Sequence, residues 1–141
     1  MSGVFWRFVR LNPELQELAA KTREISRKYE GFQVNICLNY GGRDEIVRAA
    51  RSYAERCVRG EATPGDLTEA IFGDLLFSSG VPDPDLIIRP SGELRISNFL
   101  LWQSAYAEYY YTDVLWPDFT PEELEKAIAA FNQRNRRFGG V

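Results

Sequence analysis

Apolar positions in the first quarter of the chain switch between strand-like and helix-like spacing. The stretch from Val4 to Arg10 is β-branched and aromatic with interspersed arginines, which predicts a strand. Asn12 followed by Pro13 indicates a helix start, because Asn caps helix N-termini and Pro suits the first helical position. Apolar side chains then recur at helical spacing as far as Ile25. Residues 32–38 alternate again and predict a second strand.

The middle of the chain continues the alternation. Asp44 is placed to cap a helix whose apolar stripe runs from Ile46 to Cys57. A shorter helix is expected over residues 67–77, weakened by Gly73. Residues 85–88 form a short apolar run that suits a buried strand.

The last third is predicted to be helical at two places. Ser97 or Asn98 is expected to cap a helix that reaches Ala105, and residues 109–119 are aromatic and irregular. The TPEE sequence at 120–123 has the pattern of a capping box with Pro at the first helical position. A final helix should follow it and stop at the glycine pair 139–140.

Strands that alternate with helices indicate an α/β fold: a parallel β-sheet with helices on both faces. The chain supplies about three predicted strands, and residues 1–141 are expected to form a single domain. A parallel sheet this narrow leaves strands without neighbours, so we expect other strands to complete it.

Composition narrows the function classes. The 141 residues carry a net charge of −3, which argues against a general nucleic-acid binder. No apolar run approaches the roughly 20 residues needed to span a bilayer, so at most peripheral membrane contact is expected. The first residues do not resemble a signal peptide, and we expect a cytoplasmic protein. The chain has no His, which excludes His-based catalysis, and its two cysteines are expected to be small buried apolar residues.

Residues 85–98 hold the densest group of chemically active side chains. They follow a predicted parallel strand at its carboxyl end, where ligands bind in open α/β sheets. The guanidinium groups of Arg89 and Arg95 are each able to pair with phosphate oxygens at two points. Gly92 would let the backbone approach an anion closely, and Ser97 would add a hydroxyl at a helix N-terminus. This combination suits a diphosphate.

A structural interpretation of the same residues stays open. Arg89, Glu93 and Arg95 could form a salt-bridge cluster, with Ser97 serving only as a helix cap. The NYGGR sequence at 39–43 could cradle a phosphate or could be an ordinary turn.

Longer motifs resemble a known family. The sequence RPSGELRISNFLLWQ at 89–103 is similar to the R-x-x-G-E-x-R-x-S-x-F-L-L-W-Q signature of cis-prenyltransferases, the undecaprenyl diphosphate synthase family. NYGGRDEI at 39–46 resembles another block of that family. LWPDF at 115–119 and RRFGG at 136–140 resemble its closing blocks, so the similarity runs over nearly the whole chain.

The resemblance implies an activity and roles for individual residues. Members of this family condense isopentenyl diphosphate with an allylic diphosphate, form a cis double bond and release diphosphate. Glu108 matches a residue that helps to hold Mg²⁺. Arg137 and Gly139 match an R-x-G element that reaches a diphosphate across the dimer. The residues that the resemblance places at the isopentenyl diphosphate are Arg89, Gly92, Glu93, Arg95, Ser97 and Asn98.

The resemblance also implies that part of the site lies elsewhere. The family begins with a D-G-N-G-R-W block that grips the allylic diphosphate, and this sequence does not contain it. We therefore expect the isopentenyl diphosphate-binding half of a cis-prenyltransferase, inactive without a chain that supplies the allylic site. The chain could be a fragment or one half of a split enzyme. It could also be a non-catalytic accessory subunit that stabilises a partner synthase, or an unrelated phosphate-binding module.

Overall fold

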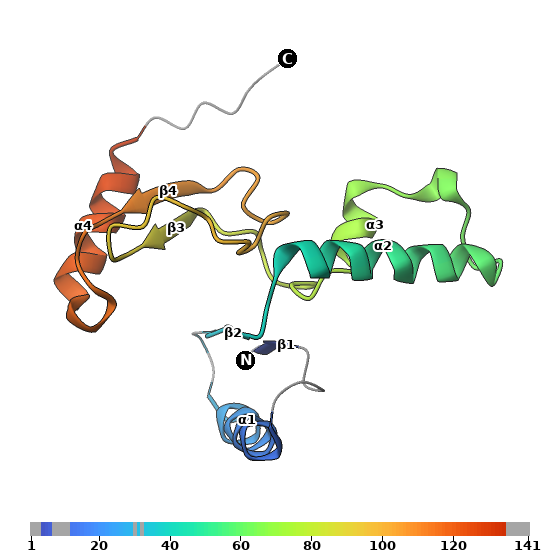
Figure 1. The fold of residues 1–141 in the computed structure, drawn as a ribbon, viewed down its shortest axis with the longest axis horizontal. Coiled ribbons are helices and arrows are strands. Elements are labelled where there is room, and N and C mark those ends of the chain that lie inside the picture. The colour runs from blue at the N-terminus through green and yellow to red at the C-terminus, as the bar shows by residue number, and fades with distance from the viewer. Residues whose placement is uncertain (1–3, 7–11, 30, 32, 135–141) are drawn as a thin grey trace. The chain divides into compact units, whose positions relative to one another are not determined.

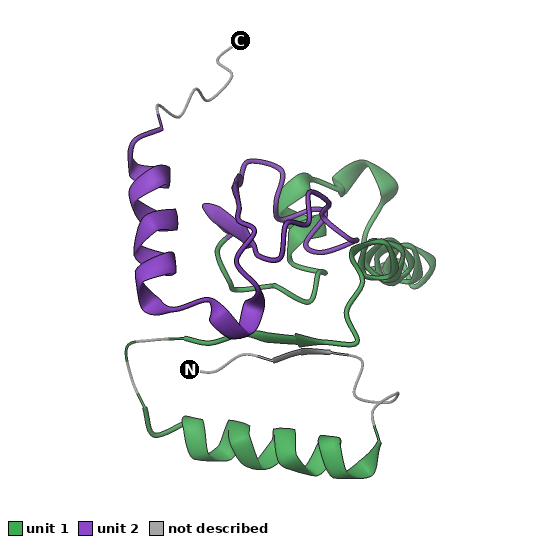
Figure 2. Cartoon of the chain, turned by 60° about the vertical axis from the view of Figure 1, so that its left-hand side comes forward, with its two compact units in different colours: residues 1–82 green, residues 83–141 purple. Residues whose placement is uncertain are grey.

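The structure is a computed structural model that describes residues 4–6, 12–29, 31 and 33–134. It divides into two compact units, residues 1–82 and residues 83–141 (Figure 2). The prediction that residues 1–141 form a single domain stays a prediction.

The first unit contains a parallel pair of short strands and three α-helices (Figure 1). Strand β1 (Val4–Trp6) runs parallel to β2 (Ile36–Leu38), with Val4 opposite Ile36. Helix α1 (Pro13–Ser26) connects them and starts as predicted, because the Asn12 Oδ1 atom accepts a hydrogen bond from the Leu15 N–H at 2.8 Å. The unit continues with α2 (Gly42–Val58), a 3₁₀ turn (Pro64–Asp66) and α3 (Glu69–Gly73).

The core of the first unit lies between α2 and the segment around α3. Ala49 and Tyr53 of α2 are buried, as are Phe72 and Leu76. Of the apolar stripe predicted on this helix only Tyr53 is buried, and Val47, Ala50 and Ala54 are exposed, so the predicted stripe is largely wrong. The helix begins at Gly42, so Asp44 lies in the first turn rather than at the cap, where its charge complements the helix dipole.

A buried carboxylate ties α2 to the chain after α3. Glu45 is only 1% exposed. Its two oxygens accept hydrogen bonds from the Tyr40 hydroxyl at 2.5 Å and from the Phe77 N–H at 2.7 Å. One turn further along the helix, the Arg48 guanidinium lies over the Phe77 ring, 4.1 Å from its centroid. These contacts fix the segment that follows α3 against α2.

The second unit is built on another parallel pair of strands. Strand β3 (Leu86–Arg89) pairs with β4 (Glu108–Tyr111), with Leu86 opposite Glu108 and Arg89 opposite Tyr111. A 3₁₀ turn (Trp116–Asp118) leads to helix α4 (Pro121–Asn132), which contacts β4 and buries Ala127 completely. Pro121 is the first helical residue as predicted, but the Thr120 side chain makes no capping hydrogen bond, so the predicted capping box is wrong. The predicted stop at residues 139–140 lies outside the described residues.

The α/β fold class with parallel strand pairing is confirmed, but two predicted details are wrong. The described residues form four strands in two separate pairs instead of about three strands, because 108–111 is a strand and not irregular. The helix predicted from Ser97 or Asn98 to Ala105 does not form. The φ angles of Ser97, Asn98 and Leu100 are +51°, +63° and +45°, a left-handed backbone that a right-handed helix cannot contain.

Two further expectations concern the cysteines and the membrane. Both cysteines are free but only partly buried, and burial together with nearby Glu45 raises the pKa of the Cys37 thiol. Within the described part of the chain, no helix has the length and apolar character of a membrane span.

Candidate functional site

A cavity of about 390 Å³ opens beside the carboxyl end of β3 in the second unit. One part of its wall is charged and comes from the turn after β3. The rest is largely aromatic and aliphatic and comes from both strands and the segments that follow them. The lining residues are Ile87, Ile88, Arg89, Pro90, Ser91, Glu93, Arg95, Ile96, Phe99, Tyr109, Tyr111 and Trp116.

Arg89 is the last residue of β3 and is half-buried at the cavity. Its Nη2 atom donates a hydrogen bond to the Ser97 Oγ atom at 3.2 Å. Among the described residues, no carboxylate forms an ion pair with it. The guanidinium is therefore held in place by a neutral hydroxyl and not by a carboxylate.

Arg95 is paired differently from Arg89. Its Nη2 atom lies 2.5 Å from the Glu93 Oε2 atom, and its side chain is 69% exposed against 33% for Glu93. An ion pair this exposed contributes little to stability. The salt-bridge cluster considered for the sequence thus exists in part: Glu93 and Arg95 pair, whereas Arg89 bonds to Ser97 instead.

The backbone of the turn is already hydrogen-bonded. The Ser91 N–H donates to the Val114 carbonyl at 2.8 Å, and the Gly92 N–H donates to the Thr112 carbonyl at 2.9 Å. Because no helix begins at Ser97, that residue offers no helix N-terminus either. An anion in this cavity would therefore meet the side chains of the two arginines rather than the N–H groups of Ser91 and Gly92.

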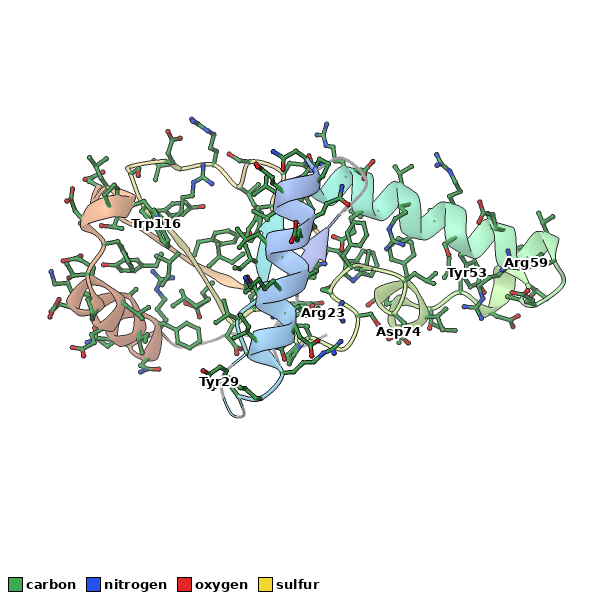
Figure 3. All side chains as sticks on the ribbon, turned by 90° about the horizontal axis from the view of Figure 1, so that it is seen from below. Arg23, Tyr29, Tyr53, Arg59, Asp74 and Trp116 are labelled. Atoms are coloured by element: carbon green, nitrogen blue, oxygen red, sulfur yellow. The ribbon has the colours of Figure 1, made fainter. Side chains whose placement is uncertain are left out.

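The apolar wall is a feature that the sequence interpretation missed. Tyr109 and Tyr111 lie on the same side of β4, and their rings stack with centroids 5.9 Å apart. Trp116 (labelled in Figure 3) stacks on Phe119 at 6.0 Å. The run of three tyrosines at 109–111 would have been the signal, because aromatic residues are enriched in strands, but this segment was interpreted as irregular. A charged edge beside an aromatic wall suits a ligand with an anionic head and an apolar tail.

Glu108, the predicted metal ligand, is not part of the cavity wall. It lies at the start of β4, opposite Leu86, whereas Arg89 pairs with the other end of that strand. Its Oε2 atom accepts from Arg134 Nη1 at 3.1 Å, and the same nitrogen donates to the Tyr109 carbonyl at 2.9 Å. In the described parts of the chain, no three His, Cys, Asp or Glu side chains gather as a metal site.

The remaining predicted site residues fall in three places. Asn98 is exposed and has a φ of +63° in the segment after Ser97. Arg137 and Gly139 lie outside the described residues. The NYGGR segment at 39–43 belongs to the first unit, where Gly41 is the N-cap of α2 and the Tyr40 hydroxyl bonds Glu45.

Comparison with known proteins identifies the family. Residues 4–139 match the protein family described as "Putative undecaprenyl diphosphate synthase". The chain belongs to this prenyltransferase family. It is 48% identical over 136 residues to an isoprenyl transferase of Streptococcus pneumoniae, covering 94% of this chain and 54% of that protein. It is 52% identical over 130 residues to an isoprenyl transferase of Prochlorococcus marinus, covering 92% and 48%.

Two solved structures in the family have the same fold. Lavandulyl diphosphate synthase from Lavandula x intermedia, in complex with dimethylallyl diphosphate, matches with a TM-score of 0.95 and 36% identity. That match covers 99% of this chain and 60% of the lavender chain. A probable undecaprenyl diphosphate synthase from Campylobacter jejuni matches with a TM-score of 0.82 and 32% identity, over 99% and 62%. The chain spans about half the length of the curated relatives that it matches.

Proposed function

We propose that this chain is the part of a cis-prenyltransferase that binds isopentenyl diphosphate for condensation with an allylic diphosphate. The observation that carries the proposal is the pair Arg89 and Arg95 at the edge of a cavity whose other walls are mainly apolar. Guanidinium groups pair with diphosphate oxygens, and the aromatic wall is suited to a five-carbon tail. The lavender relative, a structure with dimethylallyl diphosphate, supports this class of ligand.

In the proposed reaction, the C–O bond of the allylic diphosphate breaks and diphosphate leaves. A new C–C bond forms to the terminal alkene carbon of isopentenyl diphosphate, which then loses a proton and gains the cis double bond. Negative charge accumulates on the departing diphosphate, so fixed positive groups lower the barrier without a covalent nucleophile. A chain without His is compatible with this chemistry.

The two arginines would act in different ways. Arg89 is already oriented by its hydrogen bond to Ser97, so it presents a fixed guanidinium at the end of β3. Arg95 would exchange the single charge of Glu93 for the larger charge of a diphosphate. Because the Glu93–Arg95 pair is largely exposed, breaking it costs little. The pair would then keep Arg95 near its working position when no ligand is bound.

Mg²⁺ is proposed as the cofactor, with Glu108 as one ligand. Magnesium is commonly held by one or two carboxylates together with phosphate oxygens of the substrate. A single carboxylate therefore fits this ion when a diphosphate supplies further oxygens, and Arg134 would have to release Glu108. When bound, the metal would supply positive charge for the leaving diphosphate.

A second polypeptide segment is proposed to complete the enzyme. The relatives are about twice as long as this chain, and the D-G-N-G-R-W block expected for the allylic site is absent from it. We propose that the active species is a homodimer, or a heteromer that contains a chain carrying the allylic site. A cytoplasmic location is proposed with it. An accessory, non-catalytic role is the competing outcome of the test below.

The test is reconstitution. The purified chain is mixed with a polypeptide that carries the D-G-N-G-R-W half, and turnover of isopentenyl diphosphate with farnesyl diphosphate and Mg²⁺ is measured. The proposal predicts turnover in the mixture, lost when Arg89→Ala replaces the wild type and kept with Arg59→Ala. Arg95→Ala should lose turnover as well, and Arg59 is its matched control, because Arg59 forms an exposed ion pair with Glu61 as Arg95 does with Glu93. Full turnover with Arg89→Ala would assign the chain the accessory role instead.

A further inference from the structure

The turn that carries the proposed arginine clamp is tied to the segment directly after β4. Three backbone hydrogen bonds join them. The Thr112 N–H donates to the Arg89 carbonyl at 3.1 Å, the Gly92 N–H to the Thr112 carbonyl at 2.9 Å, and the Ser91 N–H to the Val114 carbonyl at 2.8 Å. The contacts extend the pairing of β3 and β4 beyond the strands and into the turn between the two arginines.

The segment directly after β4, residues 112–114, is shaped by its own side chains. The Thr112 Oγ1 atom accepts a hydrogen bond from the Val114 N–H at 3.3 Å, which turns the chain so that both carbonyls face the clamp turn. Asp113 lies between them. A Cβ atom on Gly92 would lie only 3.0 Å from the Asp113 Oδ1 atom. A larger residue at 92 would therefore be in tight contact with Asp113 unless that side chain shifted by a few tenths of an ångström.

We propose that Thr112 is a positioning residue for diphosphate binding: its backbone groups hold the clamp turn through Arg89 and Gly92, while the nearby Asp113 side chain restricts what can replace Gly92. Arg89 lies before this turn and Arg95 at its end, so the conformation of the turn sets the distance and angle between the two guanidinium groups. A misplacement of about 1 Å in such a site costs roughly 100-fold in rate. The inference rests on the proposed function of the two arginines.

Gly92 has a matched control in the same chain. Its φ is +65°, and Gly80 has a similar φ of +78°. Nothing lies within 4 Å of a Cβ atom on Gly80. Alanine at either position should destabilise the protein, because a left-handed backbone is unfavourable for a residue with a Cβ atom. Only alanine at 92 would also lie in tight contact with Asp113, so the difference between the two variants isolates the contact with the segment after β4.

The first experiment compares Gly92→Ala with Gly80→Ala. Inorganic diphosphate is titrated into the isotope-labelled chain, and the Nε–H signals of Arg89 and Arg95 are followed by NMR alongside thermal melts. Both variants should melt earlier than the wild type. Only Gly92→Ala should raise the dissociation constant, roughly tenfold if one charged hydrogen bond is lost. Adding Asp113→Ala to Gly92→Ala should recover part of the affinity. Equal affinity in Gly92→Ala and the wild type would overturn the inference.

The second experiment tests Thr112 without relying on a ligand. The Ser91 and Gly92 amides should exchange slowly with solvent in the wild type and faster in Thr112→Val, which lacks the hydroxyl acceptor. Thr112→Ser keeps the acceptor and should restore both slow exchange and diphosphate affinity. Unprotected amides in the wild type would refute the positioning role. If diphosphate does not shift the NMR signals of the two arginines while the amides remain protected, the proposed function is refuted, and with it the need for positioning.

Discussion

Arg89 and Ser97 are eight residues apart in the chain, and a hydrogen bond of 3.2 Å joins the Nη2 atom of the arginine to the Oγ atom of the serine. The bond spans the turn that contains Gly92, Glu93 and Arg95. It connects the end of β3 to the first residues of the segment that was predicted to be a helix. In place of a helix cap, Ser97 therefore serves as the partner that orients a guanidinium.

Removal of the Ser97 hydroxyl should weaken isopentenyl diphosphate binding. Because Ser97 is exposed, its bond to the Arg89 guanidinium should contribute no more than a typical hydrogen bond, about 0.5–1.5 kcal/mol, so Ser97→Ala should lose roughly two- to tenfold in affinity, measured by calorimetry. Ser26→Ala is the control, because the Ser26 hydroxyl likewise makes one hydrogen bond, in its case as the donor to the Arg23 carbonyl in α1. Unchanged affinity in Ser97→Ala would show that Arg89 does not need its neighbour.

Glu45 should contribute strongly to the stability of the first unit. Glu45→Ala would leave the Phe77 N–H and the Tyr40 hydroxyl without the acceptors they now have. We expect a loss of about 2–4 kcal/mol in the free energy of unfolding, measured by urea denaturation. Glu55→Ala, on the exposed face of the same helix, should change it by less than about 0.5 kcal/mol. Similar denaturation midpoints for the two variants would contradict this account of Glu45.

The purified chain alone should not turn over isopentenyl diphosphate with farnesyl diphosphate and Mg²⁺. The reason is that the block expected to grip the allylic diphosphate is not in its sequence. Product formation is measured with labelled isopentenyl diphosphate on protein shown by mass spectrometry to contain no other synthase. Robust product from such a preparation would refute the proposed need for a second chain.

The chain should associate with itself or with a partner through aromatic surface on the second unit. Tyr106 is 81% exposed and Trp116 71% exposed, and exposed apolar side chains at this density favour association. Light scattering over a range of concentrations should show a mass above that of the monomer. Tyr106→Ser should lower it, whereas Tyr29→Ser in the first unit should not. A monomer at every concentration would count against self-association and leave only a different partner, to be sought by pull-down.

Local sequence signals predicted the elements whose ends depend on near neighbours. Asn12 and Pro13 placed the start of α1 correctly, because a cap is a contact between residues three apart. The apolar run before Arg89 likewise predicted β3. Both predictions depend on short-range chemistry that the sequence carries directly.

Prediction from the sequence failed where pairing between residues far apart in the chain determines the structure. Strand β4 exists because Glu108–Tyr111 pairs with β3, about twenty residues earlier in the chain, and its three consecutive tyrosines show no alternation of apolar and polar residues. The apolar residues 99–102 suggested a helix, but positive φ angles at Ser97, Asn98 and Leu100 prevent one. The aromatic wall of the cavity was missed for the same reason as β4. The charged residues of the turn were found because their motif is contiguous.

The central claim is that Arg89 and Arg95 bind the diphosphate of isopentenyl diphosphate, and the most direct test is a calorimetric titration of that ligand. Wild type, Arg89→Ala, Arg95→Ala, Arg95→Lys and the control Arg59→Ala are compared, alone and with the complementary chain. Each of the three site variants should lose roughly 10- to 150-fold in affinity with little change in melting temperature. The lysine variant should lose affinity because an ammonium lacks the planar fork. Wild-type affinity in both alanine variants, together with a clear loss of thermal stability, would contradict the account.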